Sequence, residues 1–218
     1  MIIFNTDKSI VVMNVKNIIF DLGGVILKDS PISILNDLNL DKKTYNQLKL
    51  FFIDWKKLDL GEETLEDKYR QCRFPENYDI LYKDKLTNYY KYRAIDMRLI
   101  DCISKLKKNG YNVYILSDNN KECFEYYKKS DTFKDVDGWI LSCDYHTSKE
   151  EGQLFDILIK EFNLNPSECY FIDDKLSNIG EAKKHGIKGS TFTTSDDIAK
   201  LYNDMKNNGI LTLRYLDK

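Results

Sequence analysis

The arrangement of apolar and polar residues changes near residue 94, and the two patterns predict two kinds of structure. From that point onward, amphipathic stretches with helical spacing alternate with short apolar runs. Such alternation is typical of an α/β fold in which right-handed crossovers build a doubly wound parallel sheet. The expected helices are 96–108, 120–129, 150–162 and 177–185, and the expected strands are 18–20, 111–116, 138–142, 169–172 and 188–193.

Residues 29–93 contain no convincing strand and one glycine, Gly61. Apolar residues recur there at helical intervals, which predicts several short helices. We therefore expect an all-helical cap over 29–93, inserted into an α/β core made of 14–28 and 94–218. Two β-prone pieces on either side of a polar centre predict a small β extension over 1–13.

Charge and composition exclude several classes of function. The 218 residues carry 33 Lys and Arg against 35 Asp and Glu, a net charge of −2. This balance gives no broad cationic field, so neither nucleic acid nor an anionic membrane is an expected partner. No apolar run approaches the roughly 20 residues that span a bilayer. The five cysteines include no Cys-x-x-Cys pair and are expected to be reduced thiols of a cytoplasmic protein.

Polar side chains end the expected strands. Asp21 follows the apolar run 18–20 and precedes two glycines, Ser117 ends strand 111–116, and Lys149 follows strand 138–142 by a few residues. Asp173 and Asp174 end strand 169–172. In an open parallel sheet the carboxyl ends of the strands lie at one edge, so these side chains are expected to meet in one crevice. There a carboxylate can act as a nucleophile, a hydroxyl and an ammonium can bind phosphate, and clustered carboxylates can hold Mg²⁺.

These segments resemble the four motifs of the haloacid dehalogenase (HAD)-like hydrolase superfamily. Residues 17–27 resemble motif I, 114–119 motif II, Ser148-Lys149 motif III, and 171–174 with Asn178 motif IV. The similarity covers about 14–28 and 94–195, and the helical segment takes the place of the cap of capped subfamily I. The sequence is most similar to the group of α-D-glucose-1-phosphate phosphatase and the N-terminal phosphatase domain of epoxide hydrolases, whose members often read Asp-Leu-Gly at motif I.

The resemblance implies a phosphatase acting on a small phosphorylated metabolite, with a sugar phosphate as one candidate. Asp21 would attack phosphorus and form an aspartyl-phosphate, which water then hydrolyses. Lys149 would offset the repulsion between Asp21 and the phosphate dianion. The implied Mg²⁺ ligands are Asp21, the backbone carbonyl of Gly23, Asp173 and Asp174, and the implied phosphate-binding residues are Ser117, Asp118, Asn119 and Lys149.

The sequence departs from the family pattern at Gly23. Most HAD phosphatases have there, two residues after the nucleophile, an aspartate that acts as general acid and then as general base. Loss of a general acid typically costs about 10²–10⁴-fold in rate. We consider Asp118 and Asp29 as substitutes. The alternative is a catalytically weakened HAD-fold protein that binds a phosphorylated ligand or a partner. A haloacid dehalogenase is less well supported, because relatives with that activity lack the acidic pair Asp173-Asp174.

Other residues near the predicted site have simpler explanations. His146, in a loop before Lys149, is either a proton carrier or an ordinary loop residue, and His185 is expected to end a helix. Asn178 is expected to orient Asp173 or Lys149. Most aromatic residues of the cap are expected to pack between helices, with one or two facing the crevice. Hinges for cap movement are expected near 27–30 and 92–95.

Overall fold

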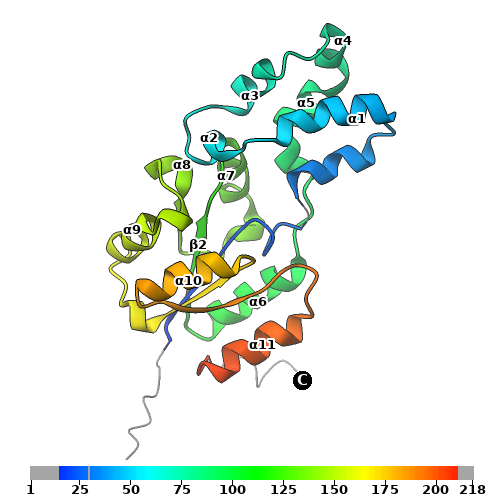
Figure 1. The fold of residues 1–218 in the computed structure, drawn as a ribbon. Helices are drawn as coiled ribbons and strands as arrows, with labels where there is room; N and C mark the ends of the chain where they lie inside the picture. The colour runs from blue at the N-terminus through cyan, green and yellow to red at the C-terminus, as the bar shows by residue number, and fades with distance from the viewer. Residues whose placement is uncertain (1–14, 29, 211–218) are drawn as a thin grey trace, which may run out of the picture.

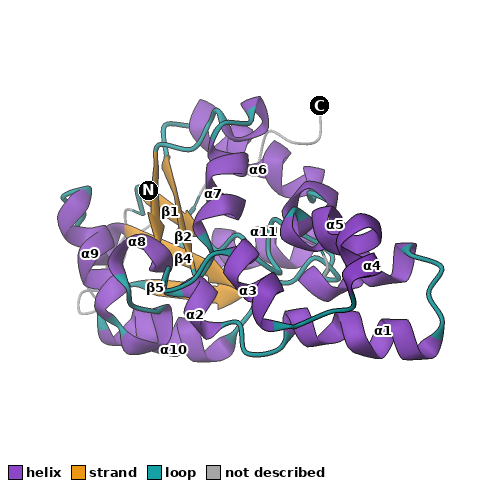
Figure 2. Ribbon diagram, turned by 90° about the horizontal axis from the view of Figure 1, so that it is seen from above, coloured by secondary structure: helices purple, strands orange, loops and turns teal. Residues whose placement is uncertain are grey.

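The computed structural model describes residues 15–28 and 30–210, which form the α/β fold that the sequence predicts (Figure 1). The predicted β extension over 1–13 lies outside the described residues. Figure 2 shows the strands side by side in one twisted sheet. The strands are β1 (Asn17–Phe20), β2 (Asn112–Ser117), β3 (Gly138–Leu141), β4 (Cys169–Asp173) and β5 (Lys188–Thr191).

All strand pairs in the sheet are parallel, and the order is β3-β2-β1-β4-β5. The central strand β1 therefore lies between β2 and β4. Its last residue, Phe20, is in register with Ile115 on one side and Ile172 on the other. Because the registers match, the carboxyl ends of these three strands lie almost level, and the residues that follow them share one edge.

Side chains that alternate along the strands form a hydrophobic core on each face of the sheet. Ile18 and Phe20 of β1 belong to the larger core, which also holds buried residues of the helices α6, α7 and α11, whereas Ile19 belongs to a smaller core built with α9 and α10. The α-helices are α1 (Lys42–Leu48), α2 (Lys56–Asp59), α3 (Leu65–Gln71), α4 (Glu76–Tyr78), α5 (Asp84–Thr87), α6 (Met97–Lys108), α7 (Lys121–Lys128), α8 (Ser142–Tyr145), α9 (Gln153–Glu161), α10 (Leu176–Lys184) and α11 (Ile198–Asn207).

Short 3₁₀ and π segments connect many of these helices, mostly between residues 31 and 92. The π-helical segment is η3 (Asp79–Lys83). The 3₁₀ segments are η1 (Pro31–Asp37), η2 (Lys49–Phe52), η4 (Tyr89–Tyr92), η5 (Asp131–Phe133), η6 (Lys149–Glu151) and η7 (Pro166–Glu168).

Several elements differ from the sequence-based expectation, among them the unexpected helix α8, which begins at the last residue of the expected strand 138–142. The helix expected from residue 150 begins at Gln153, because Gly152 adopts φ 82° and separates η6 from α9. The helix α11 was not expected. Asp197 caps it by accepting a hydrogen bond from the backbone N–H of Ala199, and Leu201 and Met205 are its buried residues.

The helices between η1 and η4 lie together on one side of the sheet, beyond its carboxyl edge (Figure 1). Two chain segments connect this group to the sheet, and they run side by side. Leu27 and Ile95 form an antiparallel β-bridge, the Lys28 N–H donates to the Ala94 carbonyl at 2.7 Å, and the Asp96 N–H donates to the Ile26 carbonyl at 2.8 Å. The segments expected to act as hinges are thus hydrogen-bonded to each other.

The described residues also include all five cysteines and the helices in which a membrane span could be sought. All five cysteines are free, as expected for reduced thiols, and four of them are buried. Within 15–28 and 30–210, every helix is too short or too polar to cross a bilayer.

A tight backbone contact in β5 leads to a prediction about stability. A Cβ atom added at Gly189 would lie 2.2 Å from the carbonyl oxygen of Phe171 on β4. Gly189→Ala is therefore expected to lower the free energy of unfolding by about 1–3 kcal/mol, measured by urea denaturation. Gly180→Ala is the matched control, because that helical position has open space, and it is expected to raise stability by about 0.5–1 kcal/mol. Equal effects of the two substitutions would contradict this explanation.

Candidate active site

The polar strand ends that the sequence singles out lie at one edge of the sheet. Asp21 directly follows the central strand β1, and its N–H donates to the carbonyl of Ile172 on β4 at 2.8 Å. Asp173 ends β4 and Ser117 ends β2, so these residues flank Asp21 on both sides. All three are buried. The parallel sheet thus brings together residues that are far apart in the sequence.

Lys149, in the segment η6 that follows β3 and α8 in the chain, joins this group. Its side chain is buried, and its Nζ lies 2.9 Å from Asp21 Oδ1 and 2.7 Å from Asp173 Oδ2. Its backbone N–H donates to Asp118 Oδ1 at 2.9 Å, which joins the loop after β2 to the segment η6. One ammonium group therefore neutralises part of the charge of two buried carboxylates.

Asp173 is fully engaged by its neighbours. Oδ1 accepts hydrogen bonds from the Lys175 N–H at 2.8 Å and from Asn178 Nδ2 at 3.1 Å. Oδ2 accepts from Lys149 Nζ, and Asn178 Nδ2 also lies 3.1 Å from this oxygen. Asn178 therefore contacts Asp173 directly, and these bonds fix the orientation of the Asp173 carboxylate toward Lys149.

The acidic residues at this edge can accommodate a divalent cation. Asp21, Asp173 and Asp174 each offer a carboxylate oxygen, and these oxygens lie within 4.8 Å of one another. A set of oxygen ligands suits hard cations such as Mg²⁺. Gly24 passes close to this group, because a Cβ atom there would lie 2.5 Å from Asp174 Oδ2. Gly24 also adopts φ 80°, so the turn after Asp21 favours glycine at this position for two reasons.

Burial and neighbouring charges shift the pKa values of these groups. Burial raises the pKa of Asp21, and the Lys149 ammonium opposes this shift. Burial and the neighbouring Asp173 carboxylate raise the pKa of Asp174. Burial alone would lower the pKa of Lys149, but Asp21 and Asp173 outweigh it and raise this pKa. The lysine therefore remains an ammonium, and a further positive charge beside Asp21 and Asp174 would favour their ionised forms.

Several buried polar atoms have no hydrogen-bond partner among the described residues, and two of these, in residues that the sequence analysis selected, have no ion pair either. They are Ser117 Oγ and Asn178 Oδ1. Buried polar groups are otherwise almost always paired, so such atoms indicate a place where a ligand or water completes the bonding. Ser117 was expected to bind phosphate, and its hydroxyl is available for such a bond.

A cavity of about 530 Å³ opens above these residues. The sheet edge contributes Asp21, Gly23, Asp118, Asn119, Lys149 and Asp174 to its lining. The helical segment contributes two aromatic residues, Trp55 and Tyr89, whose rings meet edge to face at 5.5 Å. One or two aromatic residues were expected to face the crevice, without an expectation of which ones, and Trp55 and Tyr89 line it. Asp59 of α2 also lines the cavity, although the sequence reasoning did not select it.

The two histidines lie away from the carboxylate cluster. His146 adopts φ 54° at the end of α8, and its Nδ1 lies 2.7 Å from the carbonyl oxygen of Leu60. His185 ends α10 as expected, where its ring stacks on Phe155 and its Nδ1 lies 2.8 Å from Asp156 Oδ1. His146 thus contacts the loop after α2, and it is not among the residues lining the 530 Å³ cavity.

Comparison with known proteins identifies relatives over most of the chain. A family model described as haloacid dehalogenase-like hydrolase matches residues 15–186. The D-ribitol-5-phosphate phosphatase of Bacteroides thetaiotaomicron is 29% identical over 195 residues, which cover 80% of this chain and 90% of that protein. The sesquiterpene phosphatase astK of Aspergillus oryzae is 24% identical over 185 residues, which cover 83% of this chain and 91% of that protein.

A solved structure has the same fold. The HAD family enzyme bt-2542 of Bacteroides thetaiotaomicron, crystallised in complex with magnesium and inorganic phosphate, superimposes with a TM-score of 0.64 at 22% sequence identity. The match covers 86% of this chain and 99% of that chain.

Proposed function

We propose that this chain, which belongs to the haloacid dehalogenase-like hydrolase family, is a Mg²⁺-dependent phosphatase that hydrolyses a small phosphorylated metabolite. The observation that carries the proposal is the Asp21–Lys149–Asp173 cluster beside Asp174 at the carboxyl edge of the sheet. A nucleophilic carboxylate, a buried ammonium and a cation site fit phosphoryl transfer, in which positioning and charge stabilisation supply most of the catalysis.

Asp21 takes the role of nucleophile in this proposal. It attacks the phosphorus atom of the ester and forms an aspartyl-phosphate, which water hydrolyses to regenerate the carboxylate. Lys149, at 2.9 Å from Asp21, is placed to bind a phosphate oxygen next to the attacking group. Ser117, Asp118 and Asn119 complete the phosphate site, and the unpartnered Ser117 hydroxyl supports that assignment.

The hydrogen bonds made by the carboxylates distinguish residues suited to bind the metal directly from one suited to bind it through water. Both oxygens of Asp173 already contact donors from Lys175, Asn178 or Lys149, so Asp173 suits contact with the cation through water. Asp21 and Asp174, together with the Gly23 carbonyl, are the ligands that we assign to direct binding. When bound, Mg²⁺ supplies positive charge that offsets the repulsion between the carboxylates and the phosphate.

We assign residues 14–28 and 94–218 to the core and 29–93 to a cap. Trp55 and Tyr89 reach the cavity from the helical segment, and this supports a cap that selects the leaving group. The 29% identity to a D-ribitol-5-phosphate phosphatase over 90% of its length makes polyol and sugar phosphates the first substrates to test.

Two alternatives have different support. Gly23 offers no side chain for proton transfer, which favours a protein that binds a phosphorylated ligand without turnover. A haloacid dehalogenase has no phosphate charge to balance, so the cation site of Asp173 and Asp174 argues against it. A panel of p-nitrophenyl phosphate, D-ribitol 5-phosphate and a 2-haloacid, each with and without Mg²⁺, separates the three functions. Silence with every phosphoester, combined with tight binding of one, would favour the binding protein.

Removal of the metal gives the next prediction. Chelation with EDTA is expected to lower kcat for p-nitrophenyl phosphate by about 10²-fold or more, because the cation supplies several kcal/mol of charge stabilisation in the transition state. Added Mg²⁺ is expected to restore the activity. Asp174→Asn is expected to weaken Mg²⁺ binding at least about tenfold in titration calorimetry. Asp101→Asn, an exposed carboxylate on α6, is the matched control and should bind Mg²⁺ as the wild type does. Undiminished turnover in EDTA would contradict the metal requirement.

A further inference from the structure

The core of the protein holds the end of α2 in a fixed position. Ser142 Oγ donates a hydrogen bond to the backbone carbonyl of Asp59, and His146 Nδ1 lies 2.7 Å from the carbonyl of Leu60. Gly61 adopts φ 68°, and a Cβ atom there would lie 2.5 Å from the carbonyl oxygen of Cys143. Three consecutive residues of the helical segment are therefore anchored to α8 and its flanks.

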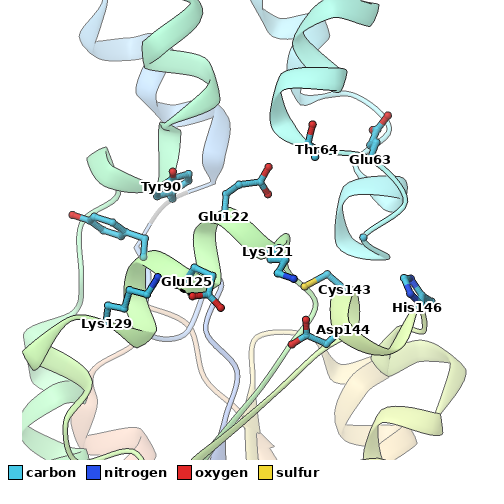
Figure 3. A pocket seen from close by; sticks show the side chains of 12 residues that line it. Glu63, Thr64, Tyr90, Lys121, Glu122, Glu125, Lys129, Cys143, Asp144 and His146 are labelled. Carbon is cyan, nitrogen blue, oxygen red and sulfur yellow. Dashed lines mark ion pairs between the residues drawn. The ribbon is translucent and has the colours of Figure 1, made fainter.

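Figure 3 shows the neighbouring cavity of about 770 Å³, in which His146 lies below the segment that leads to Glu63 and the Cys143 sulfur points toward Lys121. Ser142 Oγ also accepts a hydrogen bond from the Asn119 N–H at 2.9 Å. The same hydroxyl thus ties Asp59 to the loop after β2, which lines the catalytic cavity. The Asp59 carboxyl is presented to that cavity by a backbone whose carbonyl groups at Asp59 and Leu60 are both held by side chains of the core.

The proposed reaction needs a proton donor, because breaking the P–O bond of an alkyl ester leaves an alkoxide. Of the carboxyls around the cavity, Asp21 is the nucleophile, and Asp173 and Asp174 belong to the cation site. Asp118 accepts a hydrogen bond from the backbone N–H of Lys149. The Asp59 carboxyl has no hydrogen-bond or ion-pair partner among the residues that the structure describes. Asp29, which the sequence suggested as a donor, lies outside those residues.

We infer that Asp59 of α2 is the general acid and general base of this phosphatase, an inference that rests on the proposed function. As Asp21 attacks phosphorus, the P–O bond to the leaving group breaks, and its electron pair takes the proton of the Asp59 carboxylic acid. The alcohol departs and Asp59 is left as a carboxylate. It then accepts a proton from the water that attacks the aspartyl-phosphate, while the P–O bond to Asp21 breaks and its electron pair returns to Asp21.

The surroundings of Asp59 suit this role. Burial and, to a smaller extent, the Asp118 carboxylate raise the pKa of Asp59 to about 7, and the Lys175 and Lys149 ammonium groups oppose this shift. A general acid works best when its pKa lies near the working pH, since a useful fraction is then protonated. The charged groups that line a cavity together with Asp59 are Asp21 after β1, Arg93 after η4, Asp118 after β2, Lys149, Glu150 and Glu151 in η6, Asp174 after β4, Lys175 before α10 and Lys56 on its own helix.

The test compares two leaving groups in the full chain. For D-ribitol 5-phosphate, whose leaving group is a primary alkoxide, Asp59→Asn is expected to lower kcat/KM by about 10²–10⁴-fold. For p-nitrophenyl phosphate, whose phenolate leaves without a proton, the expected loss is less than about tenfold. Wild-type kcat/KM for the alkyl ester should fall as pH rises through about 7, because the acid form of Asp59 is lost. Asp59→Asn should abolish that limb of the profile.

Two further variants complete the experiment. Asp54→Asn is the matched control, because Asp54 is an exposed carboxylate next to α2 and is not among the residues lining the cavity. Gly23→Asp combined with Asp59→Asn is expected to recover part of the alkyl-ester activity, because a Cβ atom at Gly23 meets nothing within 4 Å. Recovered activity would show that a carboxyl group introduced at residue 23 can replace the Asp59 carboxyl as the proton donor to the leaving group.

The outcomes separate this inference from the proposed function. A wild-type protein that hydrolyses neither ester would remove the proposed function itself. An active wild type whose Asp59→Asn variant loses both activities equally, or neither, would overturn the role of Asp59 alone. Circular dichroism of the variant shows whether it remains folded.

Discussion

Asp21→Asn is expected to lower kcat on the order of 10⁵–10⁶-fold, because it removes the atom that bonds to phosphorus. The amide is close to the carboxylate in shape, so the site should keep its geometry while losing the nucleophile. In acid-quenched wild-type protein, mass spectrometry should find one added phosphoryl group on the peptide that contains Asp21. The variant should lack this modification.

The exposed Asp101 of α6 is the control for this experiment, and Asp101→Asn should retain both turnover and the phosphoryl group. Phosphorylation of a different aspartate, or an Asp21→Asn variant that keeps substantial turnover, would remove Asp21 from the mechanism.

Lys149→Met is expected to damage both activity and stability. Its ammonium is the cation that contacts Asp21 and Asp173, and all three side chains are buried. Removing one partner of a buried ion pair leaves uncompensated charge and costs about 3–5 kcal/mol. Without Mg²⁺, the free energy of unfolding from urea denaturation should fall by that amount at neutral pH. Added Mg²⁺ should restore part of it by supplying positive charge.

The pH dependence of this loss has a definite sign. Burial already raises the pKa of Asp21, and without Lys149 that pKa should rise further. A carboxyl with a raised native pKa destabilises the fold when it is ionised, so the defect of Lys149→Met should shrink as pH falls and the carboxyl takes up a proton.

Lys129→Met is the matched control, because Lys129 pairs with Glu125 on the surface of α7. Exposed pairs contribute about 0–1 kcal/mol, so this variant should unfold close to the wild type at either pH. Equal losses in the two variants would show that burial of Lys149 is energetically unimportant.

The sheet and its polar edge could be predicted because they depend on local patterns. Short apolar runs mark the strands, and the rule that parallel strands end at one edge predicts from the sequence that Asp21, Ser117 and Asp173 lie together. The strand order is a property of long-range pairing, and local patterns do not carry it. The helix α11 had a usable signal, with Asp197 as a cap and Leu201 and Met205 on one face.

Asp59 could not have been selected in the same way. Helical spacing in the segment around α2 marks Leu58 as buried, but it does not show which neighbouring polar residue meets the sheet. The orientation of Asp59 depends on Ser142, His146 and Cys143, which lie more than 80 residues later in the sequence. The dual pairing of Lys149 likewise depends on distant strands.

The two chain segments that pair at Leu27 and Ile95 make the helical segment between them structurally easy to exchange. The chain leaves the sheet at Lys28 and returns at Ala94, and these residues are hydrogen-bonded neighbours. A short turn could therefore connect Lys28 to Ala94, or a helical segment from another protein could replace residues 29–93, without moving any strand. Recombination at this junction would exchange the helical segment, Asp59 included, while leaving Asp21, Asp173 and Lys149 in place.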